Sequence, residues 1–477
     1  MEARSRDVTR FLGGLCLIAL ALRLFHLKAV ASILLNEPAG VGMDRWLQMH
    51  VAQAVARGSW LGGWSAGYDT GPAYAYWLGA LYWLGGERWM CPLLVQAFLG
   101  ALTPLFAYRL GRRVYSKRAG IIAAALTTLY TPTIFYEMLL VKFSLLPVLV
   151  MALLLSAVRA RETRATRWLL LSGIALGAFT ALRANAALAA PVVVAWFLWP
   201  ARGAVQRLRL VLLPCAGMAL VLCPLAFRDW CAAQRGLGTS LWGIHFYIGT
   251  QPGSDGTYAP VPGVREDVVG HVVDARRIAE RREGRKLTPS EVSLHWFREG
   301  LRFIRDEPLG YLAGQARKTR LAFHGDEHGS FGDDFHDYRS LSRVLRLPLL
   351  SFGVVCPLGL LGIVITLSRR RPAILPLFIG IYVLSLLPFF ITGRYRLPIA
   401  LPMLALAGES LCWIEDEIRM RRTLRLLGAT VLVVVAAAGT QVLPKDPWIL
   451  LGLLIFGVSA AWALRPDESP RAIQSTT

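Results

Sequence analysis

Two carboxylates lie next to long apolar runs, where an acidic residue is unusual. Asp44, in "VGMDRWLQMH", opens an amphipathic stretch after a long apolar run, and Glu137, in "YTPTIFYEMLLVKF", lies between two apolar runs. Asp44 has two interpretations: a general base that takes a proton from a hydroxyl, or a helix N-cap that satisfies free backbone N–H groups. Glu137 at membrane depth either faces a wet site or forms an ion pair, here with Lys142. These two readings of Glu137 are compatible, since a lysine in a site can also hold a phosphate.

Arginines follow other apolar runs in a pattern that suits an anion. Arg183 precedes Asn185 in "ALRANAAL", and Arg394 and Arg396 flank Tyr395 in "ITGRYRLPIALP". Guanidinium groups bind phosphate and carboxylate oxygens through paired hydrogen bonds. The alternative for each arginine is snorkelling to lipid headgroups. Carboxylates and arginines on one membrane face together indicate chemistry on an anionic lipid.

The composition predicts that the chain is a membrane protein. Of 477 residues, 55% are hydrophobic and 17% are charged, which is too little charge for a soluble protein of this size. Apolar stretches of about 17–25 residues predict an all-α polytopic membrane protein. The first of them is too long for a signal-peptide core and lacks a cleavage site, so we expect it to be retained. We expect about twelve spans, at 10–35, 89–108, 119–135, 138–158, 168–182, 186–199, 209–227, 349–367, 373–391, 397–413, 426–443 and 448–464.

The distribution of charge predicts the orientation. The net charge of +21 is concentrated in short breaks between apolar runs, such as "RLGRRVYSKR", "RARETRATR" and "RMRRTLR". This is the positive-inside pattern, reinforced by attraction to anionic lipid, so we expect no nucleic-acid partner. Both termini are predicted to be cytoplasmic in the inner (plasma) membrane. Asp44, Glu137 and the three arginines then lie on the extracytoplasmic face.

The predicted spans divide the chain into six segments. A first extracytoplasmic loop is rich in Trp and Tyr, which suits helices at the membrane interface. A second, polar loop carries helical stretches near 288–304 and 307–323, and we expect it to pack on the membrane face without folding as an independent domain. The segments are an N-terminal transmembrane helix (1–35), the first loop with Asp44 (36–88), transmembrane helices two to seven (89–227), the large loop (228–348), transmembrane helices eight to twelve (349–464) and a cytoplasmic tail (465–477).

Four motifs in order resemble bacterial family 39-type glycosyltransferases. The chain from "MDRW" through "YDTGPAYAYWLGALYWLGG" to "TPTIFYE" is followed by "ALRANAAL", "GIHFYIGTQPGSDGTY" and "GRYRLPIALPMLALAG". The resemblance covers most of residues 10–415. This family shares the GT-C fold with protein O-mannosyltransferases and the lipid A aminoarabinose transferase. It implies a GT-C-like helical bundle that uses a polyprenyl-phosphate sugar as donor and a lipid, glycan or protein as acceptor.

The resemblance implies roles for the acidic and basic residues. Asp44 matches the first-loop aspartate and is the expected general base. Glu137 matches the second acidic position, which would orient the acceptor or help to bind a metal. Arg183, Arg394 and Arg396 would neutralise the leaving polyprenyl phosphate.

It also implies contacts with the sugar and the phosphate. His245 and Tyr247 would form part of the wall over the sugar, and Asn185 keeps the family's turn asparagine. Tyr68 and Asp69 stand in "YDTGPAY", where aminoarabinose transferases carry a lysine and paired prolines. This departure implies another sugar or another phosphate contact. Tyr395, within the last motif, completes the expected substrate-binding residues.

An acidic, histidine-rich run leaves the metal question open. The stretch "FHGDEHGSFGDDFHDY" at 323–338 contains ligand types for Zn²⁺ or a harder divalent ion, but its spacing matches no compact metal motif. The alternative is a solvated acidic loop. Related enzymes keep a glutamate near here, which favours Glu327 as the residue that reaches the site. Lys318, just before the run, is a candidate phosphate contact.

Two other classes of function remain as alternatives. A transporter of lipid-linked sugars would place charged groups near the middle of the membrane, and here they gather at one face. An O-antigen ligase or polymerase would rely on a large late loop and would not need Asp44. Substitution of Asp44 separates that class from the glycosyltransferase reading.

Overall fold

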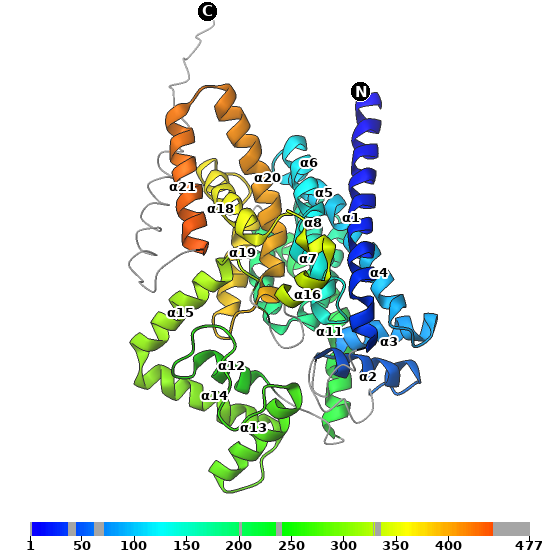
Figure 1. The fold of residues 1–477 in the computed structure, drawn as a ribbon, viewed down its shortest axis with the longest axis vertical. Coiled ribbons are helices and arrows are strands. Elements are labelled where there is room, and N and C mark those ends of the chain that lie inside the picture. The colour runs from blue at the N-terminus through cyan, green and yellow to red at the C-terminus, as the bar shows by residue number, and fades with distance from the viewer. Residues whose placement is uncertain are drawn as a thin grey trace, which may run out of the picture.

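The described part of the chain consists mainly of helices joined by turns and loops. The computed structural model describes residues 2–36, 44–61, 71–199, 203–234, 241–327, 329 and 335–441. Within them the single β-type contact is an isolated bridge between Tyr130 and Leu350. The helices (Figure 1) are α1 (Glu2–Asn36), α2 (Asp44–Ala56), α3 (Pro72–Gly85), α4 (Met90–Ala101), α5 (Thr103–Val114), α6 (Lys117–Thr128), α7 (Thr131–Tyr136), η2 (Lys142–Leu145), α8 (Leu146–Thr163), α9 (Thr166–Leu182), η3 (Ala184–Leu188), α10 (Ala189–Leu198), α11 (Ala204–Gln234), α12 (Trp242–Thr250), α13 (Val268–Glu283), α14 (Pro289–Asp306), α15 (Pro308–Phe323), α16 (Phe335–Leu341), α17 (Arg343–Arg346), α18 (Phe352–Ser368), α19 (Ile374–Leu386), η4 (Gly393–Arg396), α20 (Leu397–Arg419) and α21 (Thr423–Gln441).

The predicted all-α polytopic membrane architecture is confirmed. Five helical stretches among the described residues are long and apolar enough to cross a membrane: Arg6–Ala31, Met90–Val114, Lys142–Thr163, Ala204–Cys231 and Gly393–Arg419. Shorter apolar helices accompany them at Thr166–Leu182, Ala184–Leu198, Phe352–Ser368, Ile374–Leu386 and Thr423–Ala436. The last expected span, 448–464, lies outside the described residues, so the count of twelve remains a prediction.

Small residues bring the long helices into backbone contact. A Cβ atom on Gly173 of α9 would overlap the carbonyl oxygen of Pro214 in α11, and one on Gly408 of α20 would overlap the backbone of Ala119 in α6. Hydrocarbon solvates Leu as well as a neighbouring helix does, so helices in a membrane associate chiefly through close van der Waals packing. Glycine at these crossings permits that packing.

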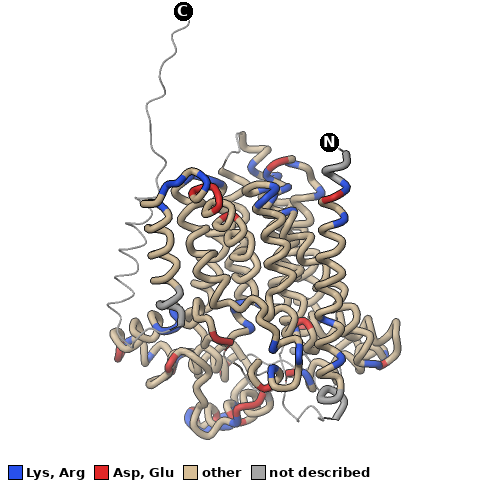
Figure 2. Tube along the Cα trace, turned by 45° about the horizontal axis from the view of Figure 1, so that its top comes forward, with Lys and Arg blue, Asp and Glu red and all other residues tan. Residues whose placement is uncertain are grey.

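The two ends of the bundle differ in charge. Figure 2 shows Lys and Arg gathered near the end at which α1 begins, where the helix connections are short. The opposite end carries the bulkier extramembrane elements, including α2, α3 and α12–α15 (Figure 1), with residues of both signs.

The large loop builds a small core of its own. Ile248 of α12, Ala275 of α13 and Trp296 of α14 belong to one buried apolar cluster, which also includes Phe390 from the turn after α19. Helix α14 begins with a capping box in which Thr288 and Glu291 exchange side-chain and backbone hydrogen bonds. The helical stretches expected near 288–304 and 307–323 correspond to α14 and α15. Phe390 links this core to the membrane bundle.

Candidate functional site

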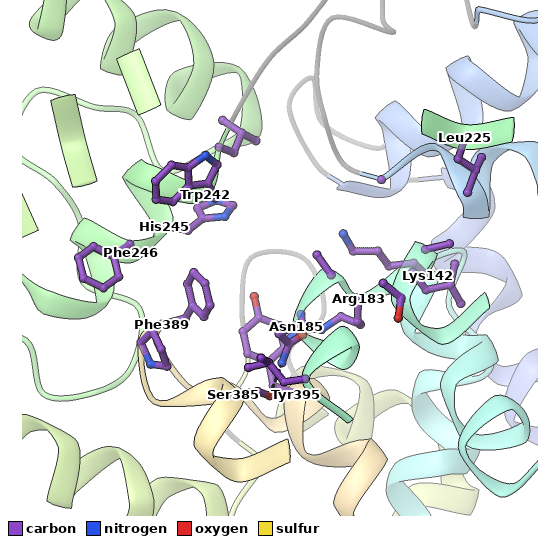
Figure 3. A pocket seen from close by; sticks show the side chains of 18 of the residues that line it. Lys142, Arg183, Asn185, Leu225, Trp242, His245, Phe246, Ser385, Phe389 and Tyr395 are labelled. Atoms are coloured by element: carbon purple, nitrogen blue, oxygen red, sulfur yellow. Dashed lines mark hydrogen bonds between the residues drawn. The ribbon is translucent and has the colours of Figure 1, made fainter. Parts of the chain in front are cut away.

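A cavity of about 930 Å³ lies where the extramembrane helices meet the bundle. Its walls come from the start of α3, η2, the end of α9, η3, α11, α12 and the turn between α19 and η4 (Figure 3). Segments that are far apart in the sequence therefore share one space. The polar and charged residues lining it are Lys142, Thr180, Arg183, Asn185, Asp229, His245, Ser385 and Tyr395.

One wall of the cavity is cationic. Lys142 enters from η2 and Arg183 from the end of α9, and both side chains extend toward the cavity in Figure 3. The Arg183 guanidinium lies 3.9 Å from the ring centroid of Tyr395 and 5.2 Å from that of Phe143. Arg394 lies 4.8 Å from the same Phe143 ring and 5.7 Å from the Tyr395 ring. Cation–π attraction to one aromatic pair thus holds two like charges in proximity.

The side-chain amide of Asn185 holds the turn that follows Arg183 in place. Arg183 leaves the end of α9 in an extended conformation, and η3 begins at the next residue. The Asn185 Nδ2 group donates a hydrogen bond to Ser385 Oγ over 2.7 Å, which ties η3 to α19. Asn185 and Ser385 both line the cavity, so this bond also fixes part of its wall (Figure 3).

Asp44, at the start of helix α2, lies close to Arg394. Its Oδ2 atom lies 3.6 Å from Arg394 Nη2, and its side chain keeps 34% of its exposure. Asp44 is the first residue of α2 and its charge suits the helix N-terminus. Arg394 shares the Phe143 and Tyr395 rings with Arg183, so this contact links the Asp44 carboxylate to the cationic wall.

His245 lies close enough to the charged residues of the cavity for them to change its pKa. The pKa of His245 is lowered to about 3: burial is the largest cause, the neighbouring His271, Lys142 and Arg183 act in the same direction, and Asp44 opposes them. The His245 and His271 rings meet edge to face with centroids 5.4 Å apart, and His271 Nε2 lies 2.9 Å from the Tyr258 hydroxyl. His245 is therefore a neutral imidazole at neutral pH, suited to hydrogen bonding with a sugar and not to holding a phosphate by charge.

The remaining walls are apolar and aromatic. Trp242, Phe246 and Phe389 face the cationic wall across the cavity (Figure 3), and Leu222 and Leu225 come from α11. Helix α11 is mostly exposed along its length, as expected of a helix at the lipid boundary. The cavity thus joins a place for an anion to a wall that borders the membrane.

Exposed aromatic rings place this end of α11 at a membrane surface. Trp60, Phe227 and Trp230 are each about half exposed, and Phe227 stacks on Trp60 and Trp230 at centroid distances of 6.4 and 6.0 Å. Trp and other aromatic side chains concentrate at the level of lipid headgroups. The cavity therefore lies at the membrane interface.

Glu137 lies apart from this cavity. Its Oε2 atom is 2.5 Å from Arg23 Nε, and the two side chains are 1% and 0% exposed. A Cβ atom on Gly100 would overlap the carboxylate, so glycine there makes room for the pair. The sequence-based alternative of a pair with Lys142 was wrong in its partner, since the structure pairs Glu137 with Arg23 and places Lys142 in the cavity wall.

Arg396 and Glu327 form a second buried pair. Arg396 Nη2 lies 3.1 Å from Glu327 Oε1, and the guanidinium also donates to the backbone carbonyls of His324 and Asp326. Arg396 thus holds the segment after α15 against the bundle. The structure commits both residues to this contact and places neither in the cavity wall.

Two further predicted residues also make contacts outside the cavity. Lys318 Nζ donates to the Leu387 carbonyl over 2.7 Å, and burial lowers the Lys318 pKa to about 8. Tyr247 packs against Trp296 with ring centroids 5.1 Å apart, inside the core of the large loop. Both residues position the loop that covers the cavity. Tyr68 and Asp69 lie outside the described residues.

Sequence reasoning missed Arg23 and His271. The signal for Arg23 was available, because an arginine within a membrane span requires a buried partner, and Glu137 is the carboxylate at that depth. His271 carried no local signal, since its approach to His245 depends on how α13 packs against α12.

No metal site is assembled by the part of the chain that the structure describes, which contains no group of three or more His, Cys, Asp or Glu side chains able to hold an ion. The described charged neighbour of Asp44 is Arg394, and its positive charge repels a divalent cation. These residues do not fit a metal, so no chemical step is assigned to one.

Comparison with known proteins agrees with the motifs. Residues 69–227 match the family model described as dolichyl-phosphate-mannose-protein mannosyltransferase. Over this stretch the resemblance is confirmed. The match includes Lys142, Arg183 and Asn185 but begins after Asp44 and ends before His245. A search of curated proteins found no match.

Solved structures with a similar arrangement are archaeal oligosaccharyltransferases. The Archaeoglobus fulgidus enzyme tethered to an acceptor peptide has a TM-score of 0.47 and 15% identity, covering 96% of this chain and 56% of that chain. AglB from the same organism, with an inhibitory peptide and a dolichol-phosphate, has a TM-score of 0.45 and 14% identity at the same coverage. The complex with Zn and sulfate has a TM-score of 0.46 and 15% identity, covering 96% and 54%. The chain thus spans about half the length of these proteins.

Proposed function

We propose that the chain is a membrane glycosyltransferase that moves a sugar from a polyprenyl-phosphate donor to an acceptor hydroxyl at the extracytoplasmic face. The observation that carries the proposal is the composition of the cavity. Lys142 and Arg183 line it, Asp44 approaches through Arg394, and the other walls are apolar and border the lipid. The matching family model is named for a sugar donor of this chemistry, dolichyl-phosphate mannose.

The donor would bind by its two chemically distinct parts. Its phosphate would contact the Arg183 guanidinium and the Lys142 ammonium, both aimed into the cavity (Figure 3). Its isoprenoid chain would follow Leu222 and Leu225 on α11 toward the membrane. The sugar would then lie between the cationic wall and His245, whose neutral imidazole can donate and accept hydrogen bonds.

The proposed reaction is a single displacement at the anomeric carbon. The Asp44 carboxylate accepts the proton of the acceptor hydroxyl as its oxygen forms a bond to that carbon. The bond from the anomeric carbon to the phosphate oxygen breaks, and its electron pair leaves with the polyprenyl phosphate. Arg183 and Lys142 stabilise the charge that develops on this leaving group. Displacement in line inverts the configuration of the anomeric carbon.

The proposal includes an orientation of the chain in the membrane, supported by the position of the cavity. It lies at the end of the bundle opposite to the Lys and Arg cluster near the start of α1 (Figure 2). By the positive-inside rule that cluster faces the cytoplasm, which puts the cavity outside and the N-terminus inside. The inner membrane and a cytoplasmic C-terminus belong to the same proposal.

Transfer from defined donors tests the proposal. Purified full-length protein is incubated with polyprenyl phosphates that carry different radiolabelled sugars and with a panel of lipid, glycan and peptide acceptors. Labelled acceptor with stoichiometric release of polyprenyl phosphate supports the proposal. Binding of donors, together with their movement across a vesicle membrane and no transfer to any acceptor, would contradict it in favour of a transporter.

A further inference from the structure

A second cavity lies at the end of the bundle where α1 begins, which the proposed function assigns to the cytoplasmic side. Its volume is about 900 Å³, and its walls are formed by α1, α5, α6 and α8. The charged side chains that line it are Arg109, Arg112, Arg113, Lys117 and Glu162. This cavity is separate from the proposed catalytic site, because it lies at the end of the bundle where α1 begins (Figures 1 and 2).

The cations of this cavity exceed its carboxylates. Glu162 Oε2 is 2.6 Å from Arg113 Nη1 and 3.6 Å from Arg159 Nη1, so two arginines already share its charge. Arg109, Arg112 and Lys117 form no ion pair within the part of the chain that the structure describes. Like charges that converge on one space repel, and an anion placed among them relieves that repulsion.

The shape of the cavity favours an anion that carries a hydrocarbon chain. Below the basic rim, Leu12 and Cys16 of α1 face Leu105 of α5. The outer side of α1 exposes Leu17 and Ile18, as expected of a helix that borders lipid. A groove with a basic rim at the cytoplasmic end and apolar walls along two membrane helices matches a phospholipid in the cytoplasmic leaflet.

We infer that this cavity binds an anionic phospholipid, with its phosphate between Arg109, Arg112 and Lys117 and one acyl chain against Leu12 and Leu105. A lipid in this position ties α1 to α5 and α6. Only a small share of the apolar stretch Arg6–Ala31 is buried against other helices, so such a bridge adds to the contacts of α1.

Two glycines of α1 offer a matched pair of variants. Gly13 lines the cavity and Gly14 does not, and a Cβ atom added to either would meet no heavy atom within 4 Å. Gly13→Leu therefore fills the cavity without changing any charge. Gly14→Leu makes the same change one residue further along α1 and serves as the control.

Binding of defined lipids to the purified full-length protein tests the inference. Phosphatidylglycerol, phosphatidylcholine and inorganic phosphate are titrated separately, and bound lipid is counted by native mass spectrometry. We expect phosphatidylglycerol to bind at least tenfold more tightly than phosphatidylcholine. Each basic charge near an anionic lipid contributes roughly a fivefold change in affinity, so Arg109→Gln with Arg112→Gln should weaken binding about 25-fold. Gly13→Leu should weaken it at least tenfold, and Gly14→Leu should leave it unchanged.

Three results would overturn the inference. Equal binding of phosphatidylcholine would remove the role of the anion, and unchanged phosphatidylglycerol binding by Gly13→Leu would remove this cavity as its location. Inorganic phosphate that displaces phosphatidylglycerol at comparable concentration would assign the cavity to a free phosphate. Because both arginines are exposed, their substitution is expected to leave the fold intact, and the glycine pair provides a test that does not depend on charge.

Discussion

Arg394 Nη2 lies 3.6 Å from Asp44 Oδ2, and this contact joins the first residue of α2 to the turn before α20. The two residues are separated by most of the chain. The same guanidinium lies over Phe143, which also lies under Arg183. One aromatic ring thus sets the position of the proposed base relative to the proposed phosphate site.

Arg394 is expected to act by positioning Asp44. Arg394→Gln removes the cation that holds the carboxylate, and a misplacement of about 1 Å costs roughly 100-fold in rate. We expect kcat to fall by about that factor while KM for the donor changes little, as measured in steady-state transfer assays. Arg394→Lys should recover part of the rate because it restores the charge. A rise in KM with unchanged kcat would instead make Arg394 a donor contact.

Arg183 is expected to act on donor affinity. Hydrogen bonds to a charged group contribute about 1.5–3 kcal/mol, so Arg183→Gln should weaken donor binding by roughly 10- to 150-fold. Binding of an unreactive polyprenyl phosphate, measured by competition, reports this loss. Arg161→Gln is a suitable control, because Arg161 also stacks on an aromatic ring, with its guanidinium 3.7 Å from the Trp196 ring centroid, and neither residue lines the cavity. Equal losses in both variants would contradict the assignment.

His245 predicts a dependence of stability on pH. Its pKa in the folded chain is about 3, and an unfolded histidine titrates near the ordinary value of 6.5. The unfolded chain therefore binds more protons between these values, and stability falls as pH decreases from about 6.5 toward 3. The thermal midpoint of wild type should fall more steeply over pH 7 to 4 than that of His245→Asn. Parallel curves would show that the imidazole is not held neutral.

The buried Arg23–Glu137 pair predicts a loss of stability. Glu137→Gln leaves the Arg23 charge buried without its counterion, which typically costs about 3–5 kcal/mol. The thermal midpoint should fall sharply, and Arg23→Met combined with Glu137→Gln should recover much of it. Normal stability of Glu137→Gln with abolished transfer would restore Glu137 as a residue of the chemistry.

The sequence predicted the membrane helices from local composition and several of the cavity residues from motifs. Apolar run length and the placement of Lys and Arg predicted the membrane architecture, because both follow from local composition. The grouping of Arg183, Asn185 and Tyr395 followed from motif order and from the assignment of one membrane face. Lys142 and His245 were also predicted and line the same cavity.

The remaining contacts of the site are between residues far apart in the sequence, and the sequence did not predict them. Nothing local distinguishes Arg394, which lies next to Asp44, from Arg396, two residues later, which is committed to Glu327 and to two carbonyls. In a helix of the 3₁₀ type, two residues of separation are enough to direct the two side chains to different partners. The partner of Glu137 comes from the first helix, 114 residues away, and no spacing rule supplies it.

The most direct test of the central claim is sugar transfer by Asp44→Asn. Asparagine keeps the size and most of the helix-capping ability of Asp44 but removes the proton acceptor. Glu87→Gln is the control, because Glu87 also pairs with an arginine, Arg57, in the same extramembrane part of the chain. We predict that Asp44→Asn loses 10²- to 10⁴-fold in kcat with donor binding and thermal midpoint retained, whereas Glu87→Gln transfers like wild type. Wild-type transfer by Asp44→Asn would show that Asp44 is only a helix cap and would contradict the proposed mechanism.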